Sequence, residues 1–322
     1  MVPPNLEAEA WTKLHNAGYA TSSGSEYIGE NVAFFAELMK NTTPGRMLDI
    51  GTGNMPIPRI GLQLQLMEQG LEIHAIDVAD IRPGNSCPSV AFRLQSSEAT
   101  DYPDDWFDLV TGSYALEYTD IEKSLVELLR VMKPGAKAGF ILHHPDSLVV
   151  QQAGRTFREL QESQNFERKL LQQFGALKKL ENFIAKPTSK NRKVIEGLLQ
   201  RLDKQDLVST YPLLRVVVNA MHTNLQSQAK GEPLSVERFR RWLRTLKGKG
   251  DDNALRHKLM QQAIVHNPDS LHEILGKLAI TVLRFDTMES DILLGSGSQA
   301  VTRHGLVGWA LIFQKKTEVL TI

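Results

Sequence analysis

The chain has 322 residues, a formal net charge of zero and 42% hydrophobic residues, which is the composition of a globular protein with a sizeable core. A neutral chain has no global field that would draw it to nucleic acid or anionic lipid. Cys87 is the single cysteine, so an internal disulfide is excluded, and no Cys/His cluster has zinc-site spacing. The first ten residues do not resemble a signal peptide, and no apolar run approaches the roughly 20 residues that cross a bilayer. We therefore expect a soluble, cytoplasmic protein with no metal and no membrane partner.

Short apolar strands alternate with helical stretches from residue 46 onward, which is typical of βαβ units around a mostly parallel sheet. The predicted strands are Met47–Ile50, Glu72–Asp77, Val90–Leu94, Phe107–Thr111, Ala138–Leu142, Ile280–Phe285 and Val307–Phe313. The predicted helices are Ile28–Met39, Ile57–Gln69, Ile121–Met132 and Leu271–Leu278. Lys133-Pro134-Gly135 is expected to end the third of these helices.

Strand signals largely stop between about residues 151 and 274, where amphipathic stretches predict helices. This helical insertion separates the fifth and sixth strands of an α/β, Rossmann-like core with a seven-stranded sheet. The chain divides accordingly into an N-terminal helical segment or lid (1–45), the core (46–150 and 271–322) and the insertion (151–270), a cap or substrate subdomain. Ligands bind outside the C-terminal ends of such strands, and the insertion leaves from that edge, so we expect it to act as a lid.

A glycine turn and an acidic residue indicate a nucleotide-type site. Asp49-Ile50-Gly51-Thr52-Gly53-Asn54 follows the first strand, and its glycines permit a tight turn that a ligand can approach closely, although ordinary strand-to-helix turns share the pattern. Asp77 ends the second strand, where it can bind ribose hydroxyls or simply be solvated. A nicotinamide dinucleotide site uses a similar Asp, so these features alone do not separate a dehydrogenase from a methyltransferase.

Four ordered motifs together resemble the class I S-adenosylmethionine-dependent methyltransferases. They are Met47-Leu48-Asp49-Ile50-Gly51-Thr52-Gly53, then Ile76-Asp77, then the run from Glu98 to Val110, and finally Leu129-Arg130-Val131-Met132-Lys133-Pro134-Gly135. The resemblance covers about residues 46 to 145, and the last two motifs are more specific than the glycines. It implies a Rossmann-like methyltransferase fold and S-adenosyl-L-methionine as cofactor. The helical insertion carries no such resemblance.

The resemblance implies a cofactor-binding role for nine residues. They are Asp49, facing the methionine amino group directly or through water; Gly51, Thr52 and Gly53, under the methionine and ribose; Asp77, at the ribose hydroxyls; Val78, on the adenine face; Glu98 and Ala99, at the adenine edge; and Ser113, near the sulfur. The family's third glycine is replaced by Met55, followed by Pro56. This departure can reshape the pocket near the methionine carboxylate.

Methyl transfer from a sulfonium is an in-line displacement that positioning and water exclusion accelerate, and a base is needed only if the acceptor must lose a proton. Four residues after the fourth and fifth strands are the catalytic candidates: Glu117, Tyr118, His143 and His144. The histidines can equally belong to a polar loop that merely ends a strand.

The segment Gly18–Tyr27 is rich in small and hydroxyl residues and precedes a predicted helix. Two roles fit it equally well. It can fold over the cofactor, or Ser23 or Ser25 can cap the helix that follows.

The insertion carries a local charge excess, because residues 151–274 contain 22 lysines and arginines against 13 aspartates and glutamates, a net charge of +9. Such a surface can hold phosphates or an acidic substrate, or it can be the solvated faces of packed helices. Its periodicity does not decide whether it packs on its own core or on a second subunit, so the oligomeric state stays open.

Three functions fit these features. The leading one is methylation of a small molecule under a helical lid. The second is an RNA methyltransferase whose basic insertion holds phosphates. Ser113-Tyr114-Ala115-Leu116 is not the Asn-Pro-Pro-aromatic motif of exocyclic-amine methylation, and the cysteine of C5-pyrimidine methylation is absent there. Methylation of a ribose or of a ring nitrogen stays open. The third is a non-catalytic protein that keeps the fold and binds partners.

Overall fold

The computed structural model describes residues 4–16, 27–81, 87–174, 254–294 and 301–317, with a few single positions between 193 and 252. The chain divides into two compact units, one made of Met1–Ala153 and Lys258–Ile322 and the other of Gly154–His257. All seven described strands belong to the first unit. The predicted domain boundaries and the helical insertion, much of which lies outside the described residues, stay predictions.

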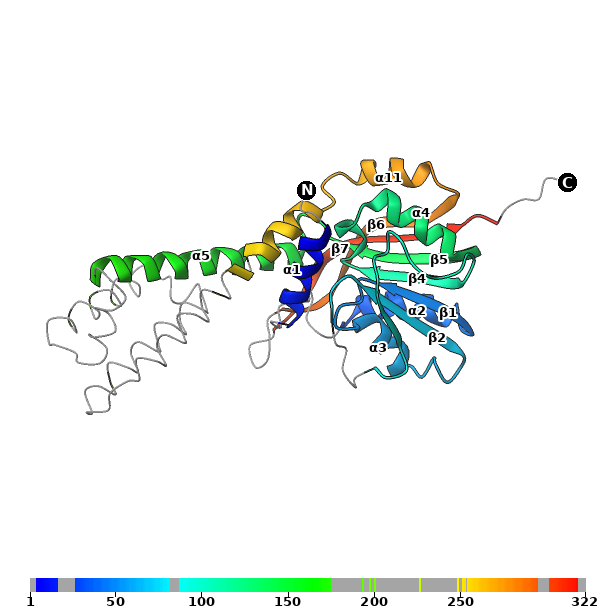
Figure 1. The fold of residues 1–322 in the computed structure, drawn as a ribbon, viewed down its shortest axis with the longest axis horizontal. Helices are drawn as coiled ribbons and strands as arrows, with labels where there is room; N and C mark the ends of the chain where they lie inside the picture. The colour runs from blue at the N-terminus through cyan, green and yellow to red at the C-terminus, as the bar shows by residue number, and fades with distance from the viewer. Residues whose placement is uncertain are drawn as a thin grey trace. The chain divides into compact units, whose positions relative to one another are not determined.

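A seven-stranded sheet of order β3-β2-β1-β4-β5-β7-β6 forms the centre of the first unit (Figure 1). The strands are β1 (Gly45–Ile50), β2 (Leu71–Asp77), β3 (Ala91–Leu94), β4 (Phe107–Ser113), β5 (Met132–Leu142), β6 (Ile280–Leu294) and β7 (Val301–Lys315). β1 to β5 are parallel, whereas β7 runs antiparallel to both β5 and β6. The predicted α/β class with a mostly parallel sheet is confirmed. The strand order reverses between β1 and β4, which is where ligands bind in sheets of this type.

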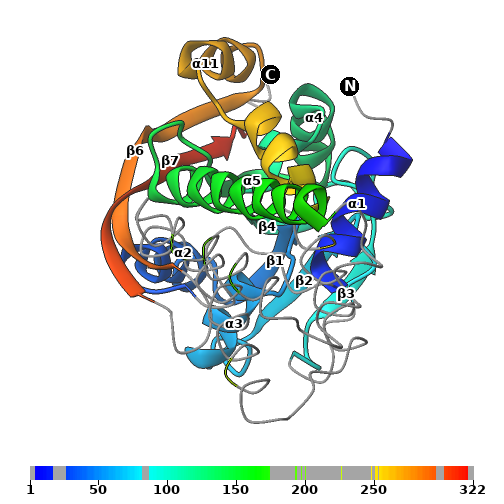
Figure 2. The ribbon, with the colours of Figure 1, turned by 90° about the vertical axis from the view of Figure 1, so that its left-hand side faces the viewer.

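Helices cover both faces of the sheet (Figure 2). The named helices are α1 (Pro4–Asn16), α2 (Glu30–Lys40), α3 (Pro56–Gln63), the 3-10 turn η2 (Leu116–Tyr118), α4 (Ile121–Val131), α5 (Leu148–Phe174) and α11 (Pro268–Gly276). Neighbouring strand residues supply separate apolar clusters: Met47 packs with α2 and α3, and Leu48 packs with α4 and α11. This alternation is the period of two that a strand imposes. None of the described helices is both long and apolar enough to cross a membrane.

Several predicted element ends are wrong. The helix expected at Ile57–Gln69 ends at Gln63, because Gln65 adopts a left-handed φ of 54° that a helix cannot continue. The strands expected at Ile280–Phe285 and Val307–Phe313 are longer, at Ile280–Leu294 and Val301–Lys315. Helix α4 ends at Val131, before Lys133-Pro134-Gly135 as expected, but β5, predicted from Ala138, begins at Met132, which pairs with Phe107. The register then shifts before Leu109, and such an irregularity accommodates a proline that cannot donate to the ladder.

The start of α2 also differs from the expectation that Ser23 or Ser25 caps it. The N-cap residue is Gly29, with a φ of 61° and no side-chain cap. The backbone N–H of Asn31 instead donates to Ser290 Oγ of β6 at 3.1 Å. Residues 17–26 lie outside the described residues, so a role for that segment over the cofactor stays a prediction.

Candidate functional site

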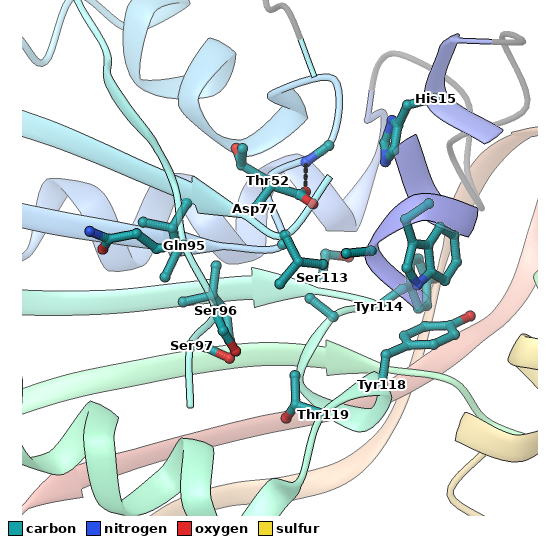
Figure 3. Close-up of a pocket in the computed structure, with 18 of the residues that line it drawn as sticks. His15, Thr52, Asp77, Gln95, Ser96, Ser97, Ser113, Tyr114, Tyr118 and Thr119 are labelled. Atoms are coloured by element: carbon teal, nitrogen blue, oxygen red, sulfur yellow. Dashed lines mark hydrogen bonds between the residues drawn. The ribbon is translucent and has the colours of Figure 1, made fainter. Parts of the chain in front are cut away.

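A pocket of about 410 Å³ opens at the C-terminal ends of β1, β2 and β4, where the strand order reverses. Its lining comes from the glycine turn after β1, the end of β2, the loop after β3, the segment after β4 and the N-terminal helix α1. Figure 3 shows side chains from these elements arranged around one shared space. The topology therefore brings together residues that are far apart in the sequence.

The glycine turn is held by the acidic residue at the end of β2. Gly51 and Gly53 have positive φ angles of 55° and 49°, and both line the pocket. The N–H of Gly53 donates to Asp77 Oδ2 at 2.9 Å, while the N–H of Ala79 donates to Asp77 Oδ1 at 2.8 Å. A Cβ at Gly51 would lie 2.5 Å from that of Ala115, so position 51 must lack a side chain. Asp77 thus fixes the loop and also faces the pocket.

Asp49 is a buried carboxylate with one oxygen unused. Its side chain is 1% exposed, Oδ1 accepts a 2.9 Å hydrogen bond from Thr111 Oγ1, and Oδ2 has no hydrogen-bond partner among the described residues. Burial raises the pKa of Asp49 to about 7, although the nearby hydroxyls of Thr52 and Thr111 act in the opposite direction. Asp49 does not itself line the pocket, whereas Ser113, whose buried Oγ also lacks a partner, does. Unused buried acceptors and hydroxyls of this kind fit a ligand that carries an ammonium group.

The predicted adenine side divides into residues that line the pocket and one that does not. Val78 and Glu98 line it, whereas Ala99 does not and is exposed. Glu98 Oε1 accepts a 2.9 Å hydrogen bond from the N–H of Asp120, the N-cap of α4. The sequence analysis missed Gln95, Ser96 and Ser97, which line the pocket directly after β3. A polar run at the C-terminal end of a parallel strand was the signal that could have found them.

Tyr118 lines the pocket and connects it to a buried histidine. Its hydroxyl lies 2.9 Å from Nε2 of His143, which is 0% exposed. The ring of Tyr114, another lining residue, stacks on His143 at 4.4 Å between centroids. Of the four predicted catalytic residues, Tyr118 lines the pocket, and His143 lies behind it.

The other two predicted catalytic residues do not line the pocket. Glu117 Oε1 accepts a 2.8 Å hydrogen bond from the backbone N–H of His143, and burial raises the pKa of Glu117 to about 8. His144 Nδ1 accepts the N–H of Asp146 at 3.0 Å, and its ring lies 4.5 Å from that of Trp309. Glu117 therefore supports His143, while His144 contacts β7.

The departure at the third glycine is accommodated away from the pocket. Met55 adopts the left-handed conformation, with φ 60° and ψ 42°, as the N-cap of α3. Its side chain is 1% exposed and packs with Ala75 and Cys87. Pro56 lines the pocket, whereas Met55 does not. The larger side chain thus keeps a glycine-like backbone without entering the pocket.

Helix α1 supplies pocket residues that the sequence analysis did not identify: Ala8, Trp11 and His15. Trp11 meets Tyr118 edge to face at 5.0 Å. The N–H of Asp80 donates to Thr12 Oγ1 at 2.9 Å, and Leu14 is fully buried. These contacts fasten α1 over the end of β2.

Part of the chain is similar to known methyltransferases. Residues 48–140 match the family model described as methyltransferase domain. The chain is 44% identical over 50 residues to the ubiquinone/menaquinone biosynthesis C-methyltransferase UbiE of Hydrogenovibrio crunogenus, covering 15% of this chain and 20% of that protein. It is 31% identical over 116 residues to the 2-phytyl-1,4-naphtoquinone methyltransferase of a Nostoc species, covering 34% of this chain and 49% of that protein.

A solved structure of geranyl diphosphate C-methyltransferase from Streptomyces coelicolor also matches, with 14% identity, a TM-score of 0.31, and coverage of 36% of this chain and 45% of that one. The chain spans half or less of the length of the curated relatives that it matches. The residues matched by the family model, 48–140, contain the glycine turn, Asp77 and the strands β2 to β4.

Proposed function

We propose that this chain, whose residues 48–140 form a methyltransferase domain of the class I S-adenosylmethionine-dependent family, transfers a methyl group from S-adenosylmethionine to a small-molecule acceptor. The observation that carries the proposal is the pocket at the strand-order reversal, where Asp77 holds the glycine turn and faces the same cavity. A bare turn would need neither the pocket nor the unused buried oxygen of Asp49 beside it.

The residues present fit the cofactor. Gly51, Thr52 and Gly53 offer a surface without bulky side chains for its methionine and ribose portions, and Asp77 offers acceptors for ribose hydroxyls. Asp49 would attract the ammonium group through a water, because it lies outside the lining residues. S-adenosylmethionine supplies an electrophilic methyl group on a sulfonium. The protein has to place an acceptor in line with that methyl group and exclude water.

The acceptor side is the part of the pocket that carries Trp11, Tyr27, Tyr114 and Tyr118. Aromatic walls of this kind favour a small, largely apolar molecule with a polar group that can reach Tyr118. The names of the relatives support this class, because they refer to quinone precursors and to geranyl diphosphate. Tyr118, hydrogen bonded to His143, is placed to orient the acceptor or to receive its proton. RNA as acceptor stays a prediction that rests on the charge of the insertion.

The direct test is calorimetric titration of the full chain with S-adenosylhomocysteine. We expect low-micromolar binding, and Asp77→Ala should weaken it at least about tenfold, which corresponds to about 1.4 kcal/mol. Asp80→Ala is the matched control, because this acidic residue lies three positions further on, is exposed and does not line the pocket. Absence of binding by the folded wild-type chain would contradict the proposal. If the wild-type chain binds S-adenosylhomocysteine, acceptors can be screened by the release of this product during turnover, starting with phenols and quinols.

A further inference from the structure

Helix α1 places a histidine against the two residues that define the cofactor end of the pocket. A Cβ built on Gly53 would lie 3.1 Å from Cε1 and 3.9 Å from Nε2 of His15, so the imidazole lies directly against the glycine turn. His15 also interacts electrostatically with Asp77. Figure 3 shows its ring at the edge of the pocket, on the side of Asp77 that is away from Thr52.

We propose that His15 is a further cofactor-binding residue that contacts the ribose hydroxyls together with Asp77. The inference rests on the proposed function and deepens it. Nothing in the four sequence motifs includes α1, and the match to the methyltransferase domain begins at residue 48.

The hydrogen-bonding capacity of Asp77 explains why a second group is useful. Its two oxygens already accept the N–H groups of Gly53 and Ala79, and a carboxylate can only accept further hydrogen bonds. Each ribose hydroxyl both donates and accepts. A neutral imidazole has one donor and one acceptor nitrogen. It can therefore donate to a hydroxyl oxygen, which Asp77 cannot do, or accept from a hydroxyl that does not donate to Asp77.

The state of His15 agrees with this role. Its Nδ1 is buried and has no hydrogen-bond partner among the described residues. Burial lowers the pKa of His15, and the nearby Asp77 only partly offsets this effect, so the ring is neutral near pH 7. Nε2, which would lie 3.9 Å from a Cβ built on Gly53, is the ring nitrogen nearer the glycine turn and the one that a ribose hydroxyl in the pocket would meet.

The position of His15 depends on contacts made by other residues of α1, so the His15 ring is not needed to hold the helix in place. Thr12 is fixed by the N–H of Asp80, and Trp11 packs against Tyr118. Trp11 and His15 are four residues apart and so lie on one face of α1. The helix is thus docked by neighbours of His15, and replacing His15 is not expected to release it.

The experiment compares three ligands on the full chain by calorimetry. S-adenosylhomocysteine carries both ribose hydroxyls, and its 2′-deoxy and 3′-deoxy analogues each lack one of them. We expect His15→Ala to weaken binding of the first about tenfold and of at least one analogue less than threefold, with an unchanged melting temperature. His15→Asn, which keeps one donor and one acceptor, should restore part of the difference. Glu9→Ala, an exposed position on the same helix, is the control.

Two results would overturn the inference. Wild-type affinity of His15→Ala would show that the ring makes no contact with the ligand. Equal weakening toward all three ligands would show that His15 only shapes the loop. Both are distinct from failure of the wild-type chain to bind S-adenosylhomocysteine, which would remove the proposed function and this inference with it.

Discussion

The hydroxyl of Tyr118 and Nε2 of His143 are 2.9 Å apart, so a side chain that lines the pocket is hydrogen bonded to one that has no exposed surface. His143 is held from two further sides, by the ring of Tyr114 and by Glu117 Oε1 at its backbone N–H. A proton taken from an acceptor by Tyr118 has a path to the imidazole. The pair can therefore act as a base without exposing the histidine to solvent.

Tyr118→Phe should lower kcat by about 10²- to 10⁴-fold on an acceptor that must lose a proton, which is the usual contribution of a positioned base. The variant keeps the ring that meets Trp11, so S-adenosylhomocysteine affinity should stay within about twofold. Turnover of an acceptor found in the screen and calorimetric binding give the two readings. Full turnover by the variant would exclude Tyr118 as the base.

Asp49→Asn should stabilise the protein at high pH and weaken cofactor binding. The folded-state pKa of about 7 lies above the unfolded value of about 4, so the folded state binds more protons between these values. Stability associated with Asp49 is therefore full below about pH 4 and is lost as pH rises through about 7. The melting temperature of the variant should exceed that of the wild type by more at pH 8 than at pH 5. An equal difference at both pH values would contradict the assignment.

Arg130→Ala should destabilise the protein by about 1–3 kcal/mol, because several hydrogen bonds made by one guanidinium are lost. Arg130 binds both oxygens of Glu127, Asp104 Oδ1 and the carbonyls of Thr100 and Tyr102. Urea unfolding of the purified variant measures the loss. Arg130→Lys keeps the charge without the planar guanidinium, so its free energy of unfolding should lie between those of the wild type and Arg130→Ala.

The same contact predicts an acid dependence. Hydrogen bonding to Arg130 lowers the pKa of Glu127 to about 2, below its unfolded value of about 4. Its stabilising effect is therefore present above about pH 4 and is lost as pH falls through about 2. The stability gap between wild type and Arg130→Ala should narrow over this interval. A gap that does not depend on pH would mean that Glu127 keeps its low pKa without Arg130.

Met55→Ala should cost about 2–5 kcal/mol, because it empties a buried site next to Ala75 and Cys87. Met55→Gly should be more stable than Met55→Ala, the reverse of the usual order in helices, since glycine adopts a φ of 60° without strain. Neither variant should change S-adenosylhomocysteine affinity by more than about twofold. A large loss of affinity would show that Met55 shapes the pocket after all.

Local sequence patterns were enough to predict that the strands exist and to identify the glycine turn and Asp77 as site residues. Apolar runs such as Phe107–Thr111 identify buried parallel strands, and Gly51, Gly53 and Asp77 belong to contiguous motifs with a chemical meaning. The start of β5 could not be found in this way, because it depends on the pairing of Met132 with Phe107. His15 was missed because α1 is positioned by distant contacts, such as Thr12 with Asp80, which leave no periodic signal.

The pairing of β5 with β7 has a consequence for the order in which the protein can fold. Leu142 pairs with Trp309, and β6, which begins at Ile280, reaches the sheet only beside β7. During synthesis at about 5–20 residues per second, β5 therefore emerges on the order of ten seconds before its neighbour exists. Until then the edge of β5 and the apolar side chains beneath it face the solvent or a chaperone. The chain is thus most exposed to misassembly while residues 143–300 are being made.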